Sequence, residues 1–126
     1  MTTHFVDSSV VVYSLDSRDL NKQARCLAWL KRLAERHALI LSPQVCAETR
    51  NVAVRKLRIS AEVAREAVRG LLPWCTAPMT AAEIEAALVL SERWRMSWWD
   101  ALLLASAKAA GCTHFLTEDA QESPVI

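Results

Sequence analysis

Short apolar runs alternate with longer segments of helical periodicity along this chain, and that alternation limits the possible folds more than any other feature. Runs at residues 4–6, 38–41, 74–77 and 112–116 have the length and composition of buried strands. Apolar residues recur at helical spacing in the segments between them. Strands that alternate with helices and helix pairs predict a three-layer α/β/α sandwich around a mostly parallel sheet of about four strands.

Capping residues predict where the helices begin. Ser42 before Pro43 is a capping hydroxyl followed by proline at the first helical position, which predicts a helix to about residue 57. Thr80 and Glu83 have the spacing of a capping box, and Ser97 is expected to begin the next helix. Asp19 can cap a helix to residue 36, and we expect that helix to bury one stripe of residues: Leu20, Ala24, Leu27, Leu30 and Ala34.

Composition favours one folded unit. The chain has 126 residues, of which 52% are hydrophobic and two are glycine, so we expect a single domain over residues 1–126. The longest apolar stretch near the N-terminus, Val10–Tyr13, is far too short to cross a bilayer, and no basic leader precedes it. The four cysteines form no C-x-x-C pair, which disfavours a zinc site. We expect a cytoplasmic protein without a membrane segment.

Charge is distributed unevenly, although the net charge is only +1. Residues 18–69 carry 12 Lys and Arg against 5 Asp and Glu, and the rest of the chain carries 3 against 9. This asymmetry is compatible with an acidic pocket beside basic helices that receive a polyanion, and equally with ordinary solvated helix faces.

Four acidic residues lie at the ends of predicted strands or near the starts of predicted helices: Asp7, Glu48, Asp100 and Asp119. Ligands of parallel sheets collect beyond the carboxyl ends of the strands, where Asp7 and Asp119 both fall. Clustered carboxylates repel one another unless a cation neutralises them, and Mg²⁺ prefers such oxygen ligands. The placement therefore predicts a magnesium-type site. Taken singly, each residue also has an ordinary explanation as a helix cap, a turn residue or a solvated side chain.

The segments FVDSS at 5–9, Val45–Glu48 after Ser42-Pro43, WDALLLASA at 99–107 and FLTED at 115–119 together resemble the PIN-domain nucleases, most closely the VapC-type toxins. The resemblance implies that Asp7, Glu48, Asp100 and Asp119 bind Mg²⁺ or Mn²⁺ and support hydrolysis of RNA phosphodiester bonds.

Further residues receive supporting roles. Ser9 and Thr117 are expected to support the metal ligands by hydrogen bonding, and Asn51 shares a helix face with Glu48. The basic residues expected to contact nucleic acid or an antitoxin are Arg50, Arg55 and Lys56. The five tryptophans are interpreted as core or dimer packing and not as base-stacking residues.

The resemblance also implies partners: a homodimer and a cognate VapB-like antitoxin whose C-terminal segment covers the active groove. Relatives usually continue past the last acidic motif into a glycine-containing turn and another short strand. This chain ends with QESPVI, so we expect that edge strand to be truncated or divergent.

Two alternatives remain. One is a catalytically impaired PIN-like module that binds a protein or nucleic acid without cleavage, which the short C-terminus would explain. The other is a phosphatase or receiver domain with an aspartate after its first strand. The dehalogenase-type phosphatases require a second aspartate two residues later, where this chain has Ser9. The second alternative is therefore the weaker one.

Overall fold

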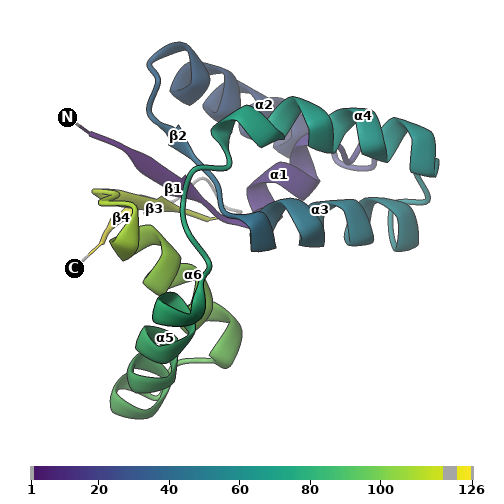
Figure 1. Ribbon diagram of the computed structural model, residues 1–126. Helices are drawn as coiled ribbons and strands as arrows, with labels where there is room; N and C mark the ends of the chain where they lie inside the picture. The colour runs from purple at the N-terminus through teal and green to yellow at the C-terminus, as the bar shows by residue number, and fades with distance from the viewer. Residues whose placement is uncertain (1, 118–121, 126) are drawn as a thin grey trace.

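The computed structural model describes residues 2–117 and 122–125 (Figure 1). In chain order the elements are β1 (His4–Val6), α1 (Ser8–Ser14), α2 (Leu20–Glu35), β2 (Leu39–Ile40), α3 (Pro43–Arg55), α4 (Ala61–Leu71), the 3₁₀ helix η1 (Leu72–Trp74), α5 (Ala81–Trp94), α6 (Trp98–Ala109), β3 (His114–Leu116) and β4 (Glu122–Pro124). The helix starts predicted from Ser42, Thr80 and Ser97 are confirmed, because each hydroxyl accepts a hydrogen bond from a backbone N–H of its own first turn.

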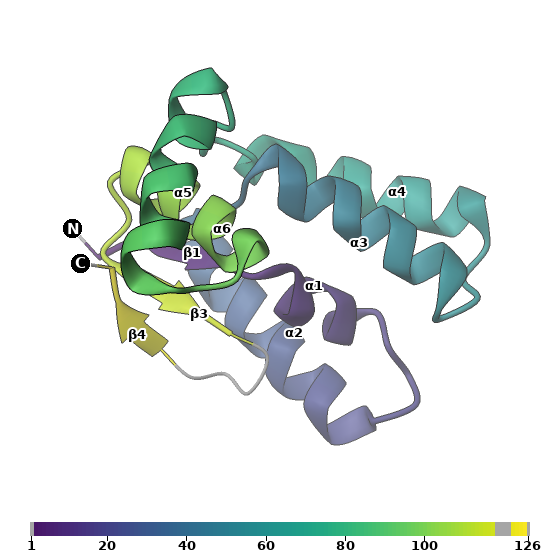
Figure 2. The same ribbon diagram turned by 90° about the horizontal axis from the view of Figure 1, so that it is seen from below.

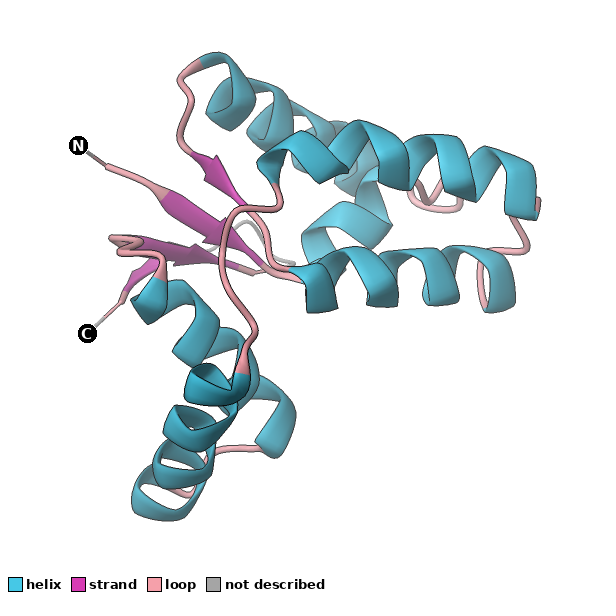
Figure 3. Cartoon of the chain, in the orientation of Figure 1, coloured by secondary structure: helices cyan, strands magenta, loops and turns pink. Residues whose placement is uncertain are grey.

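The strands form one sheet in the order β2-β1-β3-β4 (Figure 3). Strand β1 runs parallel to both of its neighbours, and Phe5 in its centre is in register with Ile40 of β2 and Phe115 of β3. Strand β4 pairs antiparallel with β3 at the edge. The predicted fold class, an α/β protein with a mostly parallel sheet of four strands, is confirmed.

Helices cover both sides of this sheet (Figure 2). Helices α1 to α4 lie together on one side, and α5 packs on α6 on the other. The main core contains fully buried side chains from the sheet and from α1, α3 and α6: Phe5, Val10, Val45, Leu103 and Leu116. A smaller cluster joins α5 to α6 through Ala87, Ala101, Leu102 and Ala105. Among the described residues no helix is long and apolar enough to span a bilayer.

The strand predicted at residues 74–77 is wrong. Residues 72–74 form η1, and only an isolated parallel bridge joins Cys75 to Leu41. Pro73 fixes φ near the helical value and has no N–H for a ladder, which favours the 3₁₀ turn over a strand. The fourth strand is instead β4, so the chain does form a short strand after the last acidic motif. The domain bounds of 1–126 stay a prediction.

Helix α2 begins as predicted, with the Asp19 carboxylate accepting a hydrogen bond from the Lys22 N–H at 3.1 Å. The stripe predicted to be buried is wrong in its first part, because Leu20 and Leu27 are 68% and 48% exposed and Ala24 is exposed as well. The face turned toward the core carries Cys26, Trp29, Leu30 and Leu33. Two adjacent stripes of this helix are apolar, and only packing against the sheet decides which of them is buried.

Candidate functional site

Asp7 lies where β1 ends and α1 begins, at the N-cap position. Its carboxylate does not act as a cap, since no N–H of α1 donates to it among the described residues. It accepts hydrogen bonds instead from the Ser8 Oγ at 3.3 Å and the Ser9 Oγ at 3.2 Å. The Asp7 N–H donates to the Leu116 carbonyl at 3.0 Å, which holds the end of β3 beside it. The side chain is therefore free to face a ligand.

Glu48 comes to the same place from α3. The Ser42 Oγ caps this helix by accepting a hydrogen bond from the Val45 N–H at 3.3 Å, and the cap fixes where the helix begins. Glu48 follows in the second turn, half-buried. Its Oε2 atom is buried and has no hydrogen-bond partner in the part of the chain that the structure describes. A buried carboxylate oxygen without a partner is costly unless a ligand completes it.

The electrostatic environment of Glu48 follows from this position. Burial raises the pKa of the Glu48 carboxyl most, and the neighbouring Asp7 charge raises it further. The polar groups of Ser8 and Trp99 nearby, together with the charge of Lys56, partly oppose that rise in pKa. Two carboxylates thus share one low-dielectric site, and a cation placed between them would relieve both burial and repulsion.

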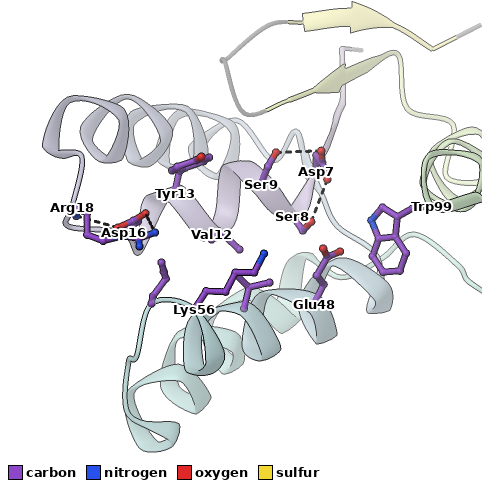
Figure 4. Close-up of a pocket in the computed structure, with 12 residues that line it drawn as sticks. Asp7, Ser8, Ser9, Val12, Tyr13, Asp16, Arg18, Glu48, Lys56 and Trp99 are labelled. Atoms are coloured by element: carbon purple, nitrogen blue, oxygen red, sulfur yellow. Dashed lines mark hydrogen bonds and ion pairs between the residues drawn. The ribbon is translucent and has the colours of Figure 1, made fainter. Parts of the chain in front are cut away.

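These side chains line one cleft of about 440 Å³ (Figure 4). Asp7, Ser8 and Ser9 come from the start of α1, Glu48 and Lys56 from α3, and Trp99 from the first turn of α6. Two carboxylates and two hydroxyls are hard oxygen donors, which suit Mg²⁺ or Mn²⁺ better than softer metals. The residues present therefore fit a hard divalent cation.

Asp16 and Arg18 lie at the other end of the cleft and were not singled out from the sequence (Figure 4). Asp16 is 4% exposed and accepts hydrogen bonds from the Arg18 Nε and Nη2, both at 2.9 Å. These bonds lower the pKa of the Asp16 carboxyl. The acid–x–base spacing of 16 and 18 was visible in the sequence, but its place in the cleft depends on the turn after α1.

Asp100 is not brought into this cleft. It is exposed in the first turn of α6, and its N–H donates to the Ser97 Oγ at 3.1 Å. The residue beside it, Trp99, lines the cleft and is 41% exposed, so it does not pack in the core, and its packing at a dimer contact stays a prediction. Across residues 2–117 and 122–125, no three His, Cys, Asp or Glu side chains form a group that could hold a metal. Asp119 lies outside the described residues.

The supporting residues fall in three places. Ser9 contacts the Asp7 carboxylate as described, and Thr117 directly follows β3 and is half-buried. Asn51 and Lys56 line a second groove that adjoins the cleft and shares Glu48 with it. Arg55 lines a further hollow with Asn51 and Lys56. Arg50 is exposed on α3.

Two comparisons with known proteins bear on these observations. The family model described as PIN domain matches residues 4–122, which is most of the chain. A search of curated proteins finds no match.

Proposed function

The chain belongs to the PIN-domain family, whose members are generally metal-dependent nucleases, and from this premise we propose that it is an endoribonuclease that hydrolyses RNA phosphodiester bonds with Mg²⁺ or Mn²⁺. The observation that carries the proposal is the unpartnered Oε2 of Glu48, which lies in the same open cleft as Asp7. That arrangement is costly for a protein without a ligand and favourable for one that captures a cation.

Asp7 and Glu48 would hold the cation, with Asp100 and Asp119 proposed as the further acidic residues of the site. Mg²⁺ commonly uses one or two carboxylates, keeps several waters and also contacts substrate phosphate, so two protein carboxylates suffice to bind it. When bound, the ion would make water acidic enough to serve as the nucleophile and offset charge on the phosphoryl oxygens.

The chain's own side chains do the remaining work. Ser8 and Ser9 fix the orientation of the Asp7 carboxylate through their hydrogen bonds. Lys56, at the C-terminal end of α3, supplies positive charge on the cleft wall for a phosphate of the RNA. Trp99 lines the cleft beside Glu48. The hydrolysis would need no covalent enzyme intermediate.

We further propose that the protein is a VapC-type toxin with a cognate VapB-like antitoxin, acts in the cytoplasm and forms a homodimer. The four sequence motifs support the toxin assignment. Exposed cations on and after α3, namely Arg50, Arg55 and Lys56, offer contacts for an acidic antitoxin segment. Helix α5 leaves Leu88, Val89 and Trp94 between 48% and 64% exposed, which supports an apolar dimer contact.

A second candidate is a PIN-like module that binds nucleic acid or a protein without cleavage. The exposed position of Asp100, outside the cleft that holds Asp7 and Glu48, favours it. Metal-dependent cleavage separates the two candidates.

The test is incubation of the purified protein with single-stranded and structured RNA in Mg²⁺, in Mn²⁺ and in chelator. We expect cleavage that requires the metal and is lost in Asp7→Asn. The matched control is Glu85→Gln, which removes one exposed carboxylate of α5 and should cleave normally. Equal cleavage in chelator would refute metal dependence, and RNA binding without cleavage would support the non-cleaving module. The toxin assignment is tested in cells. Expression of the chain should arrest growth, and co-expression of a neighbouring small open reading frame should relieve that arrest.

A further inference from the structure

The side chain of Gln44 has an unusual environment. Gln44 is in the first turn of α3, directly after Pro43. In the described part of the chain, neither its Nε2 nor its Oε1 has a hydrogen-bond partner, and both atoms are buried. A buried amide group without a hydrogen-bond partner has lost its water and destabilises the fold. A ligand that offers one donor and one acceptor side by side would remove that cost.

Gln44 lines the groove next to the catalytic cleft. This groove has a volume of about 560 Å³ and shares Glu48, Lys56 and Trp99 with the cleft. Asn51, exposed on α3, adds a second amide to the groove. A chain that passes through the cleft can therefore extend directly into the groove.

Trp99 lines both spaces. Its side chain is directed toward Glu48 (Figure 4), and both residues line the cleft. Trp99 is 41% exposed. A tryptophan on the wall of a groove and open to solvent is a ready stacking surface, because every nucleobase has a π-face.

We propose that this groove binds one nucleobase of the RNA strand next to the scissile phosphate, with the Trp99 ring stacking on the base and the Gln44 amide pairing with its edge. The inference rests on the proposed nuclease function and names the substrate feature that the same site reads. The N6 and N7 groups of adenine present one donor beside one acceptor, which a glutamine amide matches with two hydrogen bonds. The corresponding edge of guanine presents two acceptors. In this proposal the base turns its N6 and N7 edge toward Gln44, and the groove therefore selects adenine over guanine.

A nucleobase fits the groove better than a protein segment does. The groove continues from the cleft where the phosphate would lie, and Lys56 is shared between them. Base recognition in single strands combines an aromatic platform with hydrogen bonds to base edges, and the groove holds both. The competing explanation for Trp99 is that it only positions Glu48 by lying beside it in the cleft.

The test measures RNA binding in the full chain carrying Asp7→Asn, so that no cleavage is needed. Labelled short RNAs carry adenine, guanine or an abasic nucleotide at each position in turn. Trp99→Ala should weaken binding of the adenine RNA about tenfold, and Trp99→Phe should recover most of it. The abasic RNA should bind equally to the Asp7→Asn protein with and without Trp99→Ala. Gln44→Leu should abolish the preference for adenine over guanine.

The matched control is Trp98→Ala, which removes a 43% exposed tryptophan of α6 that lines neither the cleft nor the groove. It should leave RNA binding unchanged. Equal weakening of intact and abasic RNA by Trp99→Ala would overturn the proposal, and so would an unchanged base preference in Gln44→Leu. Loss of antitoxin binding without loss of RNA binding would assign the groove to a protein instead. Cleavage by the wild-type protein is measured separately, so failure of the nuclease function is distinguishable from failure of the subsite.

Discussion

Glu48 faces the same cleft as Asp7 although 40 residues of chain separate them, and the Asp7 charge helps to raise the pKa of the Glu48 carboxyl. Asp7 is placed by the end of a central strand and Glu48 by a capped helix. The two carboxylates thus line one cleft because β1 ends beside the N-terminal half of α3. Every prediction about the site depends on this arrangement.

Removing the hydroxyl that orients Asp7 should reduce cleavage. In Ser9→Ala the Asp7 carboxylate loses its 3.2 Å hydrogen bond, and we expect cleavage to fall about tenfold, as for other groups that orient metal ligands. The measurement is kcat/KM on one RNA at saturating Mn²⁺. Ser17→Ala, at an exposed position after α1, is the control and should leave kcat/KM unchanged.

Metal should stabilise the folded protein, independently of any catalysis. At a free Mn²⁺ concentration one hundred times the Kd, binding adds about 2.7 kcal/mol to the free energy of unfolding. Thermal unfolding with increasing Mn²⁺ should therefore show a rising Tm for the wild-type protein. The rise should be absent or strongly reduced in Asp7→Asn. An equal rise in both proteins would place the metal elsewhere.

Glu48→Gln should stabilise the metal-free protein at neutral pH while it removes activity. Burial, together with the Asp7 charge, raises the folded-state pKa of Glu48 above its unfolded value. The contribution of Glu48 to stability is therefore complete below the unfolded pKa and is lost as pH rises through the folded pKa. Glutamine is neutral at every pH, so the variant does not lose this stability as the pH rises.

The check is the difference in Tm between Glu48→Gln and wild type in chelator over a pH series. This difference should be positive at neutral pH and should shrink as pH falls below the ordinary glutamate pKa. A variant that is less stable than wild type at every pH would contradict the raised pKa.

The cap of α3 should matter for the site as well as for stability. Ser42→Ala removes the hydrogen bond to the Val45 N–H and should cost about 1 kcal/mol of unfolding free energy. It should also lower cleavage, because Glu48 is on the helix that this cap positions. Ser60→Ala removes the equivalent bond to the Val63 N–H at the start of α4 and should cost a similar amount without lowering cleavage. Denaturant unfolding and kcat/KM together separate the two effects.

Local signals in the sequence predicted much of the fold. A helix start depends on a few neighbouring residues, so Ser42, Thr80 and Ser97 were readable directly. The strand predicted around Trp74 failed because an apolar run does not distinguish a strand from a 3₁₀ turn. The buried face of α2 failed for Leu20 and Leu27, since the choice between two apolar stripes is made by the sheet.

The candidate site was partly predictable for a related reason. Asp7 and Glu48 follow from where elements end and begin, and the structure brings them together. Asp100 also begins a helix, yet its side chain is exposed while the adjacent Trp99 lines the cleft. Which of two neighbouring side chains faces the cleft depends on how α6 is rotated against the sheet. No sequence pattern predicts that the Gln44 amide is buried without a hydrogen-bond partner among the described residues.

Helix α6 belongs to both hydrophobic clusters of the described chain, whereas α5 packs chiefly on α6. The first turn of α6 carries Trp99, so its position is tied mechanically to a helix on the outer surface of the molecule. Removing α5 would uncover Ala101, Leu102 and Ala105, which are on the same helix as Trp99.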